Sequence, residues 1–304
     1  MSLVAISLLG RASRSIAARG SAEVDHICQA RPLSTATAPK FDEEMAKIYA
    51  HIANQHFHED GPWPVMLSTV GGFMNDRPAG KVLDIATGPG QPGISVAKAF
   101  PDATIVLSDV SEDMLAKATA ASKDLPNTST VIANAEDLPY GDNEFDVVTC
   151  CYGYMFCEDK AKALQESYRV LKPGGMLVAT TWDKLDFLKL TKDIMTEVLG
   201  KTPPPPPLNP MSMHEPGMME DLVTNAGFKE MKVSHSSYPF DMGADSDFQF
   251  SMVTILVKDK IAELGAKAVA EKAFHDNKDK YSETAADGTM VVAGNTFKLV
   301  TAIK

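Results

Sequence analysis

An acidic residue followed by a glycine-rich turn is the part of the sequence best suited to binding chemistry. Residues 81–93 read Lys-Val-Leu-Asp-Ile-Ala-Thr-Gly-Pro-Gly-Gln-Pro-Gly. The apolar residues predict a β-strand around Asp84, and the glycines predict a turn that lets a ligand approach the backbone, because glycine has no Cβ and tolerates positive φ. Gly88–Gly93 also match the spacing G-x-G-x-x-G of dinucleotide-binding turns, so a nicotinamide oxidoreductase has to be weighed.

The charge of Asp84 separates the two kinds of ligand that such a turn can hold. Two unit charges about 4 Å apart at an effective dielectric of 20 interact by about 4 kcal/mol. The interaction is repulsive for a diphosphate and attractive for an ammonium or sulfonium group. Asp84 therefore favours a ligand with positive charge near the turn. In an alternative interpretation, Asp84 is a capping carboxylate that accepts backbone N–H bonds.

Two further polar segments follow predicted strands. Asp109 comes 19 residues after Gly90, and its two carboxylate oxygens can accept both hydroxyls of a ribose, which suits NAD and other nucleosides equally. Residues 134–140 read Asn-Ala-Glu-Asp-Leu-Pro-Tyr. There a side-chain oxygen can accept a hydrogen bond from an adenine amino group, while a backbone N–H serves a ring nitrogen.

These segments lie in a regular alternation of strands and helices, which predicts an α/β fold with a doubly wound, mostly parallel sheet. Ligands of such sheets bind at the carboxyl ends of the strands. Strands are predicted at 82–85, 104–107, 130–133, 145–151 and 176–181, and helices at 93–100, 112–121 and 159–170.

The flanking segments predict additional covers for the ligand site. Residues 41–78 have apolar residues at helical spacing and predict a helical N-terminal cover over the ligand mouth. A helical insert and tail are expected after the fifth strand, with helices at 187–199, 216–226 and 247–279 and a stiff proline run at 203–207. Strands are expected at 228–238, 290–292 and 296–303, the last two as a pair joined through Gly294-Asn295.

Four motifs together resemble the class I (Rossmann-like) methyltransferases that use S-adenosylmethionine (SAM). The motifs are residues 82–90, Ser108-Asp109, residues 134–140 and Arg169-Val-Leu-Lys-Pro-Gly-Gly175. The family usually has glycine where Ala86 stands and often has aspartate where Asn134 stands. The resemblance covers about residues 41–304 and implies one methyltransferase domain, with a seven-stranded sheet whose last strand, 296–303, is antiparallel.

The resemblance also implies the cofactor SAM and methyl transfer to the O, S, N or C atom of a small-molecule acceptor. The residues expected to bind the cofactor are Tyr49, Asp84, Ala86, Gly88, Gly90, Asp109, Val110, Met114, Asn134, Ala135, Glu136 and Cys151. Within the family, the third and fourth motifs are most similar to those of ubiquinone/menaquinone C-methyltransferases. The alternatives are an S-methyltransferase for thioether hydroxy acids, macromolecular methylation, and a catalytically silent organelle assembly factor.

Methyl transfer needs the acceptor held in line in a dry pocket, and a base only where the acceptor must lose a proton. His56, His58 and Tyr154 are the candidates for acceptor contact and catalysis. Other candidate pocket residues are His51, Trp63, Tyr152, Phe156, Cys157, Trp182 and Asp183. We expect no metal, because no cysteine pair has zinc-ligand spacing beside suitable histidines.

Charge and hydropathy exclude some classes of protein. The formal net charge of the 304 residues is −11, which argues against a large nucleic-acid footprint, since such footprints are basic. No apolar run approaches the ~20 residues of a membrane-spanning helix. Cys150, Cys151 and Cys157 are expected to be reduced and buried. The oligomeric state leaves no signature in the sequence.

The first 40 residues differ from the rest of the chain. They hold five basic and two acidic residues, a charge of +3, which leaves −14 for residues 41–304. With frequent serine and alanine, this composition is typical of an organelle transit peptide. We expect mitochondrial import, with the plastid as the alternative destination and a disordered tail as the alternative interpretation.

Overall fold

The structure is a computed structural model that describes residues 43–206 and 209–304, apart from the side chains of residues 43–46 and 49. All described residues belong to one compact unit, Pro39–Lys304. The expectations for residues 1–40, for Pro207 and for the side chain of Tyr49 lie outside the described part of the chain.

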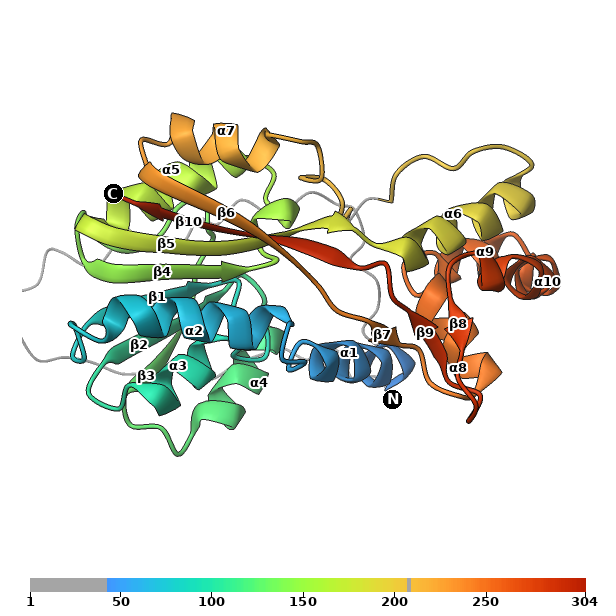
Figure 1. Ribbon diagram of the computed structural model, residues 1–304, viewed down its shortest axis with the longest axis horizontal. Helices are drawn as coiled ribbons and strands as arrows, with labels where there is room; N and C mark the ends of the chain where they lie inside the picture. Colours follow the sequence, from blue (N-terminus) through green and yellow to red (C-terminus); the bar gives the residue numbers. More distant parts are fainter. Residues whose placement is uncertain (1–42, 207–208) are drawn as a thin grey trace, which may run out of the picture. The chain divides into compact units, whose positions relative to one another are not determined.

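A seven-stranded sheet in the order β3-β2-β1-β4-β5-β10-β6 forms the centre of this unit (Figure 1). β10 is antiparallel to both neighbours and the pairs among β1 to β5 are parallel, which confirms the predicted sheet. The order reverses at β1, between β2 and β4, where ligands of such sheets bind. The strands are β1 (Lys81–Ile85), β2 (Thr104–Asp109), β3 (Thr128–Ile132), β4 (Phe145–Cys151), β5 (Leu171–Lys184), β6 (Lys229–Ser237) and β10 (Thr296–Ile303).

Helices cover both faces of this sheet. α2 (Pro62–Met74), α3 (Gly93–Ala99) and α4 (Glu112–Ser122) lie on one face, and α5 (Lys160–Val170) and α7 (Met218–Asn225) lie on the other (Figure 1). Ser111 begins α4 by accepting a hydrogen bond from the Met114 amide, and Asp159 begins α5 in the same way. With both faces covered, the inner strands bury nearly continuous apolar runs such as Val82-Leu83 and Val147-Val148.

A second group of elements follows β5. It contains α6 (Asp186–Leu199), α8 (Ser246–Thr254), α9 (Lys258–Glu263) and α10 (Lys267–Asn277), of which α10 packs on α6. A three-stranded sheet, β7-β9-β8, comprises β7 (Phe240–Asp241), β8 (Glu283–Thr284) and β9 (Met290–Val292). α1 (Glu43–Gln55) contacts β7. The helical segment expected at 247–279 is therefore three helices.

One expected strand pair is wrong. The segments at 290–292 and 296–303 are both strands, but they do not pair with each other. β9 pairs with β7 and β8 in the small sheet, whereas β10 pairs with β5 and β6 in the large one. β10 has two long neighbours with which to form hydrogen bonds, and those bonds outweigh the local turn at Gly294-Asn295.

None of the helices in residues 43–206 and 209–304 is long and apolar enough to span a membrane. Over the same residues, no cluster of three or more His, Cys, Asp or Glu side chains is arranged to hold a metal ion.

Candidate active site

The carboxylate of Asp84 is completely buried, and both of its oxygens accept hydrogen bonds from the chain. Thr149 Oγ1 donates to Oδ1 at 2.6 Å, and Thr87 Oγ1 donates to Oδ2 at 2.6 Å. The Gly93 amide donates to the same Oδ2 at 3.0 Å. Burial raises the pKa of Asp84 to about 6 against the opposing effect of these bonds, so the group is mainly ionised at neutral pH.

This arrangement matches the capping interpretation of Asp84, because its oxygens hold the turn in shape. Any effect of Asp84 on a ligand is therefore electrostatic. The hydrogen bond between Asp84 and Gly93 also argues against a dinucleotide. Gly93 is the first residue of α3, so Asp84 already accepts a hydrogen bond at the helix end that a diphosphate would use. A diphosphate at this helix end would have to displace the hydrogen bond from the Gly93 amide and would be repelled by the buried carboxylate of Asp84.

The backbone of the turn is left-handed at three positions. Ala86 has φ +53°, Gly88 has φ +55° and Gly90 has φ +110°. A Cβ at Gly90 would overlap the end of the Ile94 side chain, which would have to move, and residues with a side chain rarely adopt this φ. The glycine that the family usually has in place of Ala86 suits this conformation, and alanine adopts it at a cost of about 1–2 kcal/mol.

Asp109 lies beside this turn at the end of β2. Its Oδ2 accepts a hydrogen bond from the Gly88 amide at 2.9 Å, and its Oδ1 accepts one from the Ser111 amide at 2.9 Å. Each oxygen keeps a further acceptor position, so a ribose diol can still be held. Next to it, the side chain of Val110 is 49% exposed, which provides an apolar surface for a planar base.

The segment after β3 is also fixed from several sides. Asn134 Oδ1 accepts a hydrogen bond from the Glu136 amide at 3.0 Å. Glu136 Oε1 accepts hydrogen bonds from the amides of Glu158 and Asp159 at 2.7 and 3.1 Å, which ties this segment to the start of α5. Asn134 is exposed and Ala135 half-buried, so both are accessible to a ligand.

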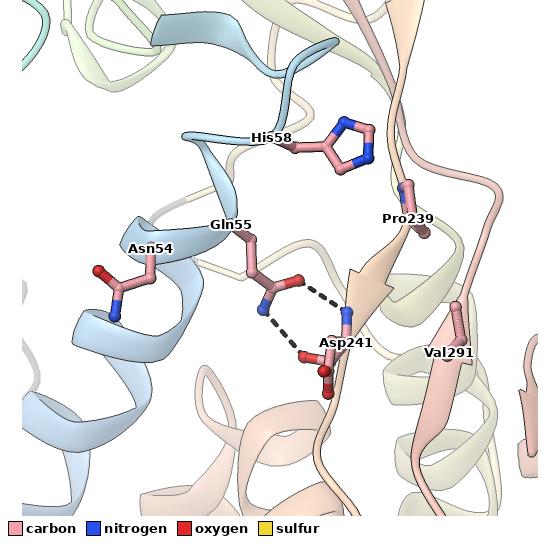
Figure 2. A pocket seen from close by; sticks show the side chains of 6 residues that line it. All are labelled: Asn54, Gln55, His58, Pro239, Asp241 and Val291. Atoms are coloured by element: carbon pink, nitrogen blue, oxygen red, sulfur yellow. Dashed lines mark hydrogen bonds between the residues drawn. The ribbon is translucent and has the colours of Figure 1, made fainter. Parts of the chain in front are cut away.

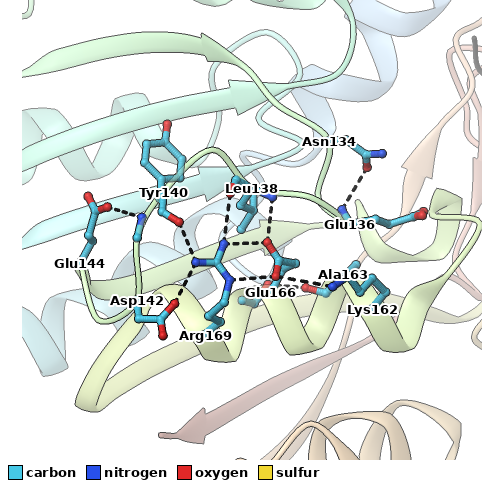
Figure 3. Close-up of polar contacts among 12 residues, drawn as sticks. Asn134, Glu136, Leu138, Tyr140, Asp142, Glu144, Lys162, Ala163, Glu166 and Arg169 are labelled. Carbon is cyan, nitrogen blue, oxygen red and sulfur yellow. Dashed lines mark hydrogen bonds and ion pairs between the residues drawn. The ribbon is translucent and has the colours of Figure 1, made fainter. Parts of the chain in front are cut away.

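Arg169 holds the far end of that segment on α5 (Figure 3). Its Nη1 donates to the Tyr140 carbonyl at 2.6 Å and its Nη2 to the Leu138 carbonyl at 3.1 Å. Two further bonds, at 2.8 and 2.7 Å, join the guanidinium to both carboxylate oxygens of Glu166. Glu166 in turn accepts the Leu138 amide at 2.9 Å. The motif that begins at Arg169 thus positions the motif at residues 134–140.

The residues present fit a nucleoside with a positively charged group. The glycine turn, Asp109 and the segment from Asn134 follow β1, β2 and β3, which are neighbours in the sheet. In this arrangement Asp109 is available for a ribose, Val110 and Asn134 for a base, and the charge of Asp84 lies behind the turn. Cys151 ends β4 on the other side of β1 and is half-buried, with its Sγ accepting a hydrogen bond from Thr180 Oγ1 at 3.5 Å.

His56 lies in a cluster of aromatic side chains close to the ends of β4 and β5. Its ring centroid lies 5.3 Å from that of Trp63, 5.5 Å from Tyr152 and 6.3 Å from Trp182. Its Nδ1 shares a hydrogen bond of 2.7 Å with the Tyr238 hydroxyl. Burial lowers the pKa of His56 to about 3, so the imidazole is neutral at physiological pH.

The structure does not bring Tyr154 into this cluster, and its contact with an acceptor stays a prediction. The side chain of Tyr154 is 1% exposed, and its hydroxyl shares a hydrogen bond of 2.7 Å with Ser167 on α5. Burial raises the pKa of that hydroxyl well above its usual value. Tyr154 is therefore a core residue. His58 is exposed and lies on Tyr238, with the two ring centroids 6.2 Å apart.

Tyr152 and Tyr238, rather than Tyr154, lie beside His56. Tyr152 stacks on Trp182, with ring centroids 4.2 Å apart and an interplanar angle of 8°. The role of Tyr238 was missed because it lies 182 residues from His56 in the chain, and no local pattern links the two. Only the position of the strand expected at 228–238, which the structure shows as β6, could have pointed to it.

Comparison with known proteins gives the class of this domain. Residues 82–175 match the family described as "Methyltransferase domain". The ubiquinone/menaquinone biosynthesis C-methyltransferase UbiE of Rickettsia prowazekii is 39% identical over 123 residues, which cover 38% of this chain and 48% of the relative. The chain thus matches about half the length of that curated relative.

Solved structures share the fold. Phosphoethanolamine N-methyltransferase 2 of Haemonchus contortus, solved with SAM, has a TM-score of 0.53 at 18% identity, covering 88% of this chain and 58% of that one. The YcgJ protein of Bacillus subtilis has a TM-score of 0.51 at 18% identity, covering 79% and 97%.

Residues 82–175 therefore match a methyltransferase domain, and the solved structures show that the chain shares the fold of methyltransferases. Within that class, the sequence of this region is similar to the ubiquinone/menaquinone C-methyltransferases of the UbiE type.

Proposed function

We propose that this protein transfers a methyl group from SAM to a small-molecule acceptor, with residues 41–304 acting as one methyltransferase domain. The observation that carries the proposal is the carboxylate of Asp84, buried directly behind a left-handed glycine turn. A fixed negative charge at that place favours a cationic nucleoside over a dinucleotide. The match of residues 82–175 to the methyltransferase family supports the same conclusion.

Each part of the site has a role in this proposal. Asp109 binds the ribose, Val110 and Met114 contact the base, and Asn134 with the Ala135 amide binds the adenine edge. Cys151 and the backbone from Ala86 to Gly90 surround the rest of the molecule, with Glu136 supporting the base-binding segment, and Tyr49 stays a predicted contact. When bound, SAM supplies an electrophilic methyl group on a positively charged sulfur. The aromatic side chains around His56 exclude water from the acceptor.

A more specific candidate function is C-methylation of a quinone precursor. The similarity to UbiE over the cofactor-binding region supports it. The acceptor-binding elements after β5 lie outside the matched residues, so the acceptor is a separate question from the cofactor.

A labelling experiment tests the catalytic proposal. The full chain is incubated with SAM carrying an isotopically labelled methyl group and a metabolite extract, and mass spectrometry identifies the labelled product. We expect one labelled small molecule, and a labelled quinone precursor would establish the more specific function. SAM binding without any labelled product would favour a catalytically silent assembly factor, and labelled protein or RNA would favour a macromolecular acceptor.

We also propose that the protein is imported into mitochondria. The charge of +3 and the richness in serine and alanine of residues 1–40 support this proposal. A fusion of residues 1–40 to a fluorescent protein should enter mitochondria, and replacement of Arg11, Arg14 and Arg19 by glutamine should leave it in the cytosol. Plastid import of the fusion, or no import at all, would contradict the proposal.

A further inference from the structure

We propose that the aromatic cluster around His56 and the groove beside His58 form one acceptor site, which takes a neutral molecule with an apolar body and a single O–H or S–H group. The proposal rests on the proposed methyl transfer and adds to it the place and the chemical class of the acceptor. It predicts methylation at O or S, so a C-methylated quinone precursor as product would contradict it.

The aromatic cluster lies next to the cofactor turn. Tyr152 directly follows β4, which pairs with β1, so Cys150 lies opposite Ile85. The chain after β4 touches the turn itself, because a Cβ on Gly153 would come within 2.6 Å of the Ala86 Cβ. An acceptor that contacts Tyr152 is therefore beside the turn that holds the methyl donor.

Tyr152 has a strained backbone and, within the described part of the chain, a hydroxyl without a well-formed hydrogen bond. Its φ is +57°, a conformation that a bulky side chain rarely adopts and that is common at functional sites. Its hydroxyl oxygen is buried and has no hydrogen-bond partner of normal geometry, although the Tyr238 hydroxyl lies close enough to affect its pKa. An unpaired buried hydroxyl is unfavourable, and a hydroxyl or thiol on the acceptor would pair with it.

In the part of the chain that the structure describes, the side chains that contact the ring of His56 carry no charge. Within the described residues, its ring contacts are all to uncharged aromatic side chains: Trp63, Tyr152, Trp182, Tyr238 and Phe240. A buried ammonium group would find no carboxylate in this shell. Aromatic faces can bind cations, but here Tyr152 and Trp182 cover one face of each other by stacking. The shell therefore favours a neutral reacting group, while the carboxylate of Asp241, which lines the groove, is largely exposed to solvent.

His56 shares a hydrogen bond with Tyr238 that orients its ring. When His56 Nδ1–H donates to the Tyr238 oxygen, Nε2 keeps a free electron pair that can take a proton. The acceptor's O–H or S–H bond then breaks, its proton goes to Nε2, its electron pair bonds the methyl carbon, and the carbon–sulfur bond breaks to leave a neutral thioether. The proton then passes from the imidazole to solvent, because the uncharged shell disfavours a lasting positive charge on His56. Tyr238 is the positioning residue.

A groove lies beside His58, next to this cluster (Figure 2). It has a volume of about 310 Å³ and is lined by Asn54, Gln55, His58, Pro239, Asp241 and Val291. The ring of His58 lies against Tyr238, which bonds His56, so the groove and the cluster share this wall. The apolar body of the acceptor fits between α1 and the small sheet.

Intrinsic fluorescence tests the proposal without knowledge of the natural acceptor, because both tryptophans of the chain, Trp63 and Trp182, contact His56. The full chain, saturated with S-adenosylhomocysteine, is titrated with cyclohexanethiol, cyclohexanol and cyclohexylamine at pH 7. These probes share one apolar body, and only the amine is charged. We expect saturable fluorescence changes with the thiol and the alcohol at concentrations at least tenfold below any change with the amine.

Two variants and one control complete the test. Tyr152→Phe and His56→Gln should each weaken binding of the alcohol at least fivefold, while exposed Lys260→Ala should leave it unchanged. Equal or tighter binding of the amine, no saturable change with any probe, or insensitivity to both variants would overturn the inference. Calorimetry with S-adenosylhomocysteine alone separates the two proposals: its failure to bind contradicts the methyltransferase function, whereas its binding without the probes contradicts only the acceptor site.

Discussion

At the scale of single residues, the site depends on two titratable groups whose burial disfavours their charged forms. Burial raises the pKa of Asp84 to about 6 and lowers that of His56 to about 3. Hydrogen bonds from Thr87, Thr149 and Gly93 keep Asp84 largely ionised at neutral pH, whereas His56 stays neutral. Asp84 thus supplies negative charge behind the glycine turn at neutral pH, and His56 is the neutral base that we propose beside the acceptor.

The lowered pKa of His56 predicts a pH-dependent loss of stability. The unfolded chain binds a proton at His56 below about pH 6.5, and the folded chain does so only near pH 3. Stability is therefore lost as the pH falls through 6.5 toward 3. Between pH 8 and 4.5, His56→Gln should lose roughly 2 kcal/mol less unfolding free energy than the wild type, measured by urea denaturation. Exposed His58→Gln is the control, and equal losses in wild type and His56→Gln would contradict the shift.

The left-handed backbone of Ala86 predicts an unusual tolerance of glycine. Glycine relieves the strain at φ +53° but makes the unfolded chain more flexible, and these effects, each about 1 kcal/mol, oppose each other. Ala86→Gly should therefore change stability by less than about 0.5 kcal/mol. Ala118→Gly, in the buried face of α4, should cost about 2 kcal/mol in the same urea experiment, from helix propensity and a lost buried methyl group. Equal losses at both positions would argue against strain at Ala86.

At the scale of elements, the site depends on contacts that join segments far apart in the sequence. Arg169 and Glu166 on α5 hold the segment after β3 (Figure 3). Asp84 on β1 holds the start of α3. α1 is joined to β7 by side-chain bonds to the Asp241 backbone.

Arg169→Lys should loosen the base-binding segment. Lysine cannot make the paired bonds to Glu166 and also reach the carbonyls of Leu138 and Tyr140. We expect a loss of about 1–3 kcal/mol in stability and a three- to tenfold weaker affinity for SAM, with faster amide exchange in residues 134–140. Lys260→Ala, which removes an exposed ion pair, serves as the control. Unchanged amide exchange in residues 134–140 would show that Arg169 does not hold the segment.

Gln55→Ala should free α1 from the small sheet. The Gln55 side chain donates to the Asp241 carbonyl at 2.9 Å and accepts from the Asp241 amide at 2.7 Å, as a neighbouring strand would. Its removal should speed amide exchange in α1 and at Asp241, with about 1–2 kcal/mol of lost stability. Asn54→Ala, at the preceding residue of α1, is the matched control. The same exchange rates in both variants would show that Gln55 does not hold α1 to the small sheet.

The sequence predicted the large sheet and the cofactor turn because these depend on local patterns. Alternating strands and helices, the glycines after Asp84 and the cap at Ser111 are each contained in short segments. The partners of β9 and the position of Tyr238 could not be predicted in this way, because they depend on how elements after β5 fold back. The burial of Tyr154 could not be predicted for a related reason: a tyrosine after a strand can point to the ligand or into the core, and Ser167 decides the matter through its hydrogen bond.

At the scale of the whole molecule, two parts of the chain have different tasks. The large sheet carries the elements that match known methyltransferases, at the ends of β1, β2 and β3. The elements after β5, together with α1, surround the aromatic cluster and its groove. The cofactor region can thus resemble many relatives while the acceptor region differs. The net charge of −11 also favours a donor with an extra positive charge over its neutral product.

Calorimetric titration of the full chain with SAM tests the central claim, that the buried charge of Asp84 favours a cationic donor, most directly. The titration is repeated with S-adenosylhomocysteine, with NAD, and with the Asp84→Asn variant at equal folded fraction. We expect one SAM per chain, no binding of NAD, and at least tenfold weaker SAM binding by the variant with a smaller loss for S-adenosylhomocysteine. Binding of NAD in preference to SAM, or the same affinity for SAM with and without the charge at position 84, would contradict the account.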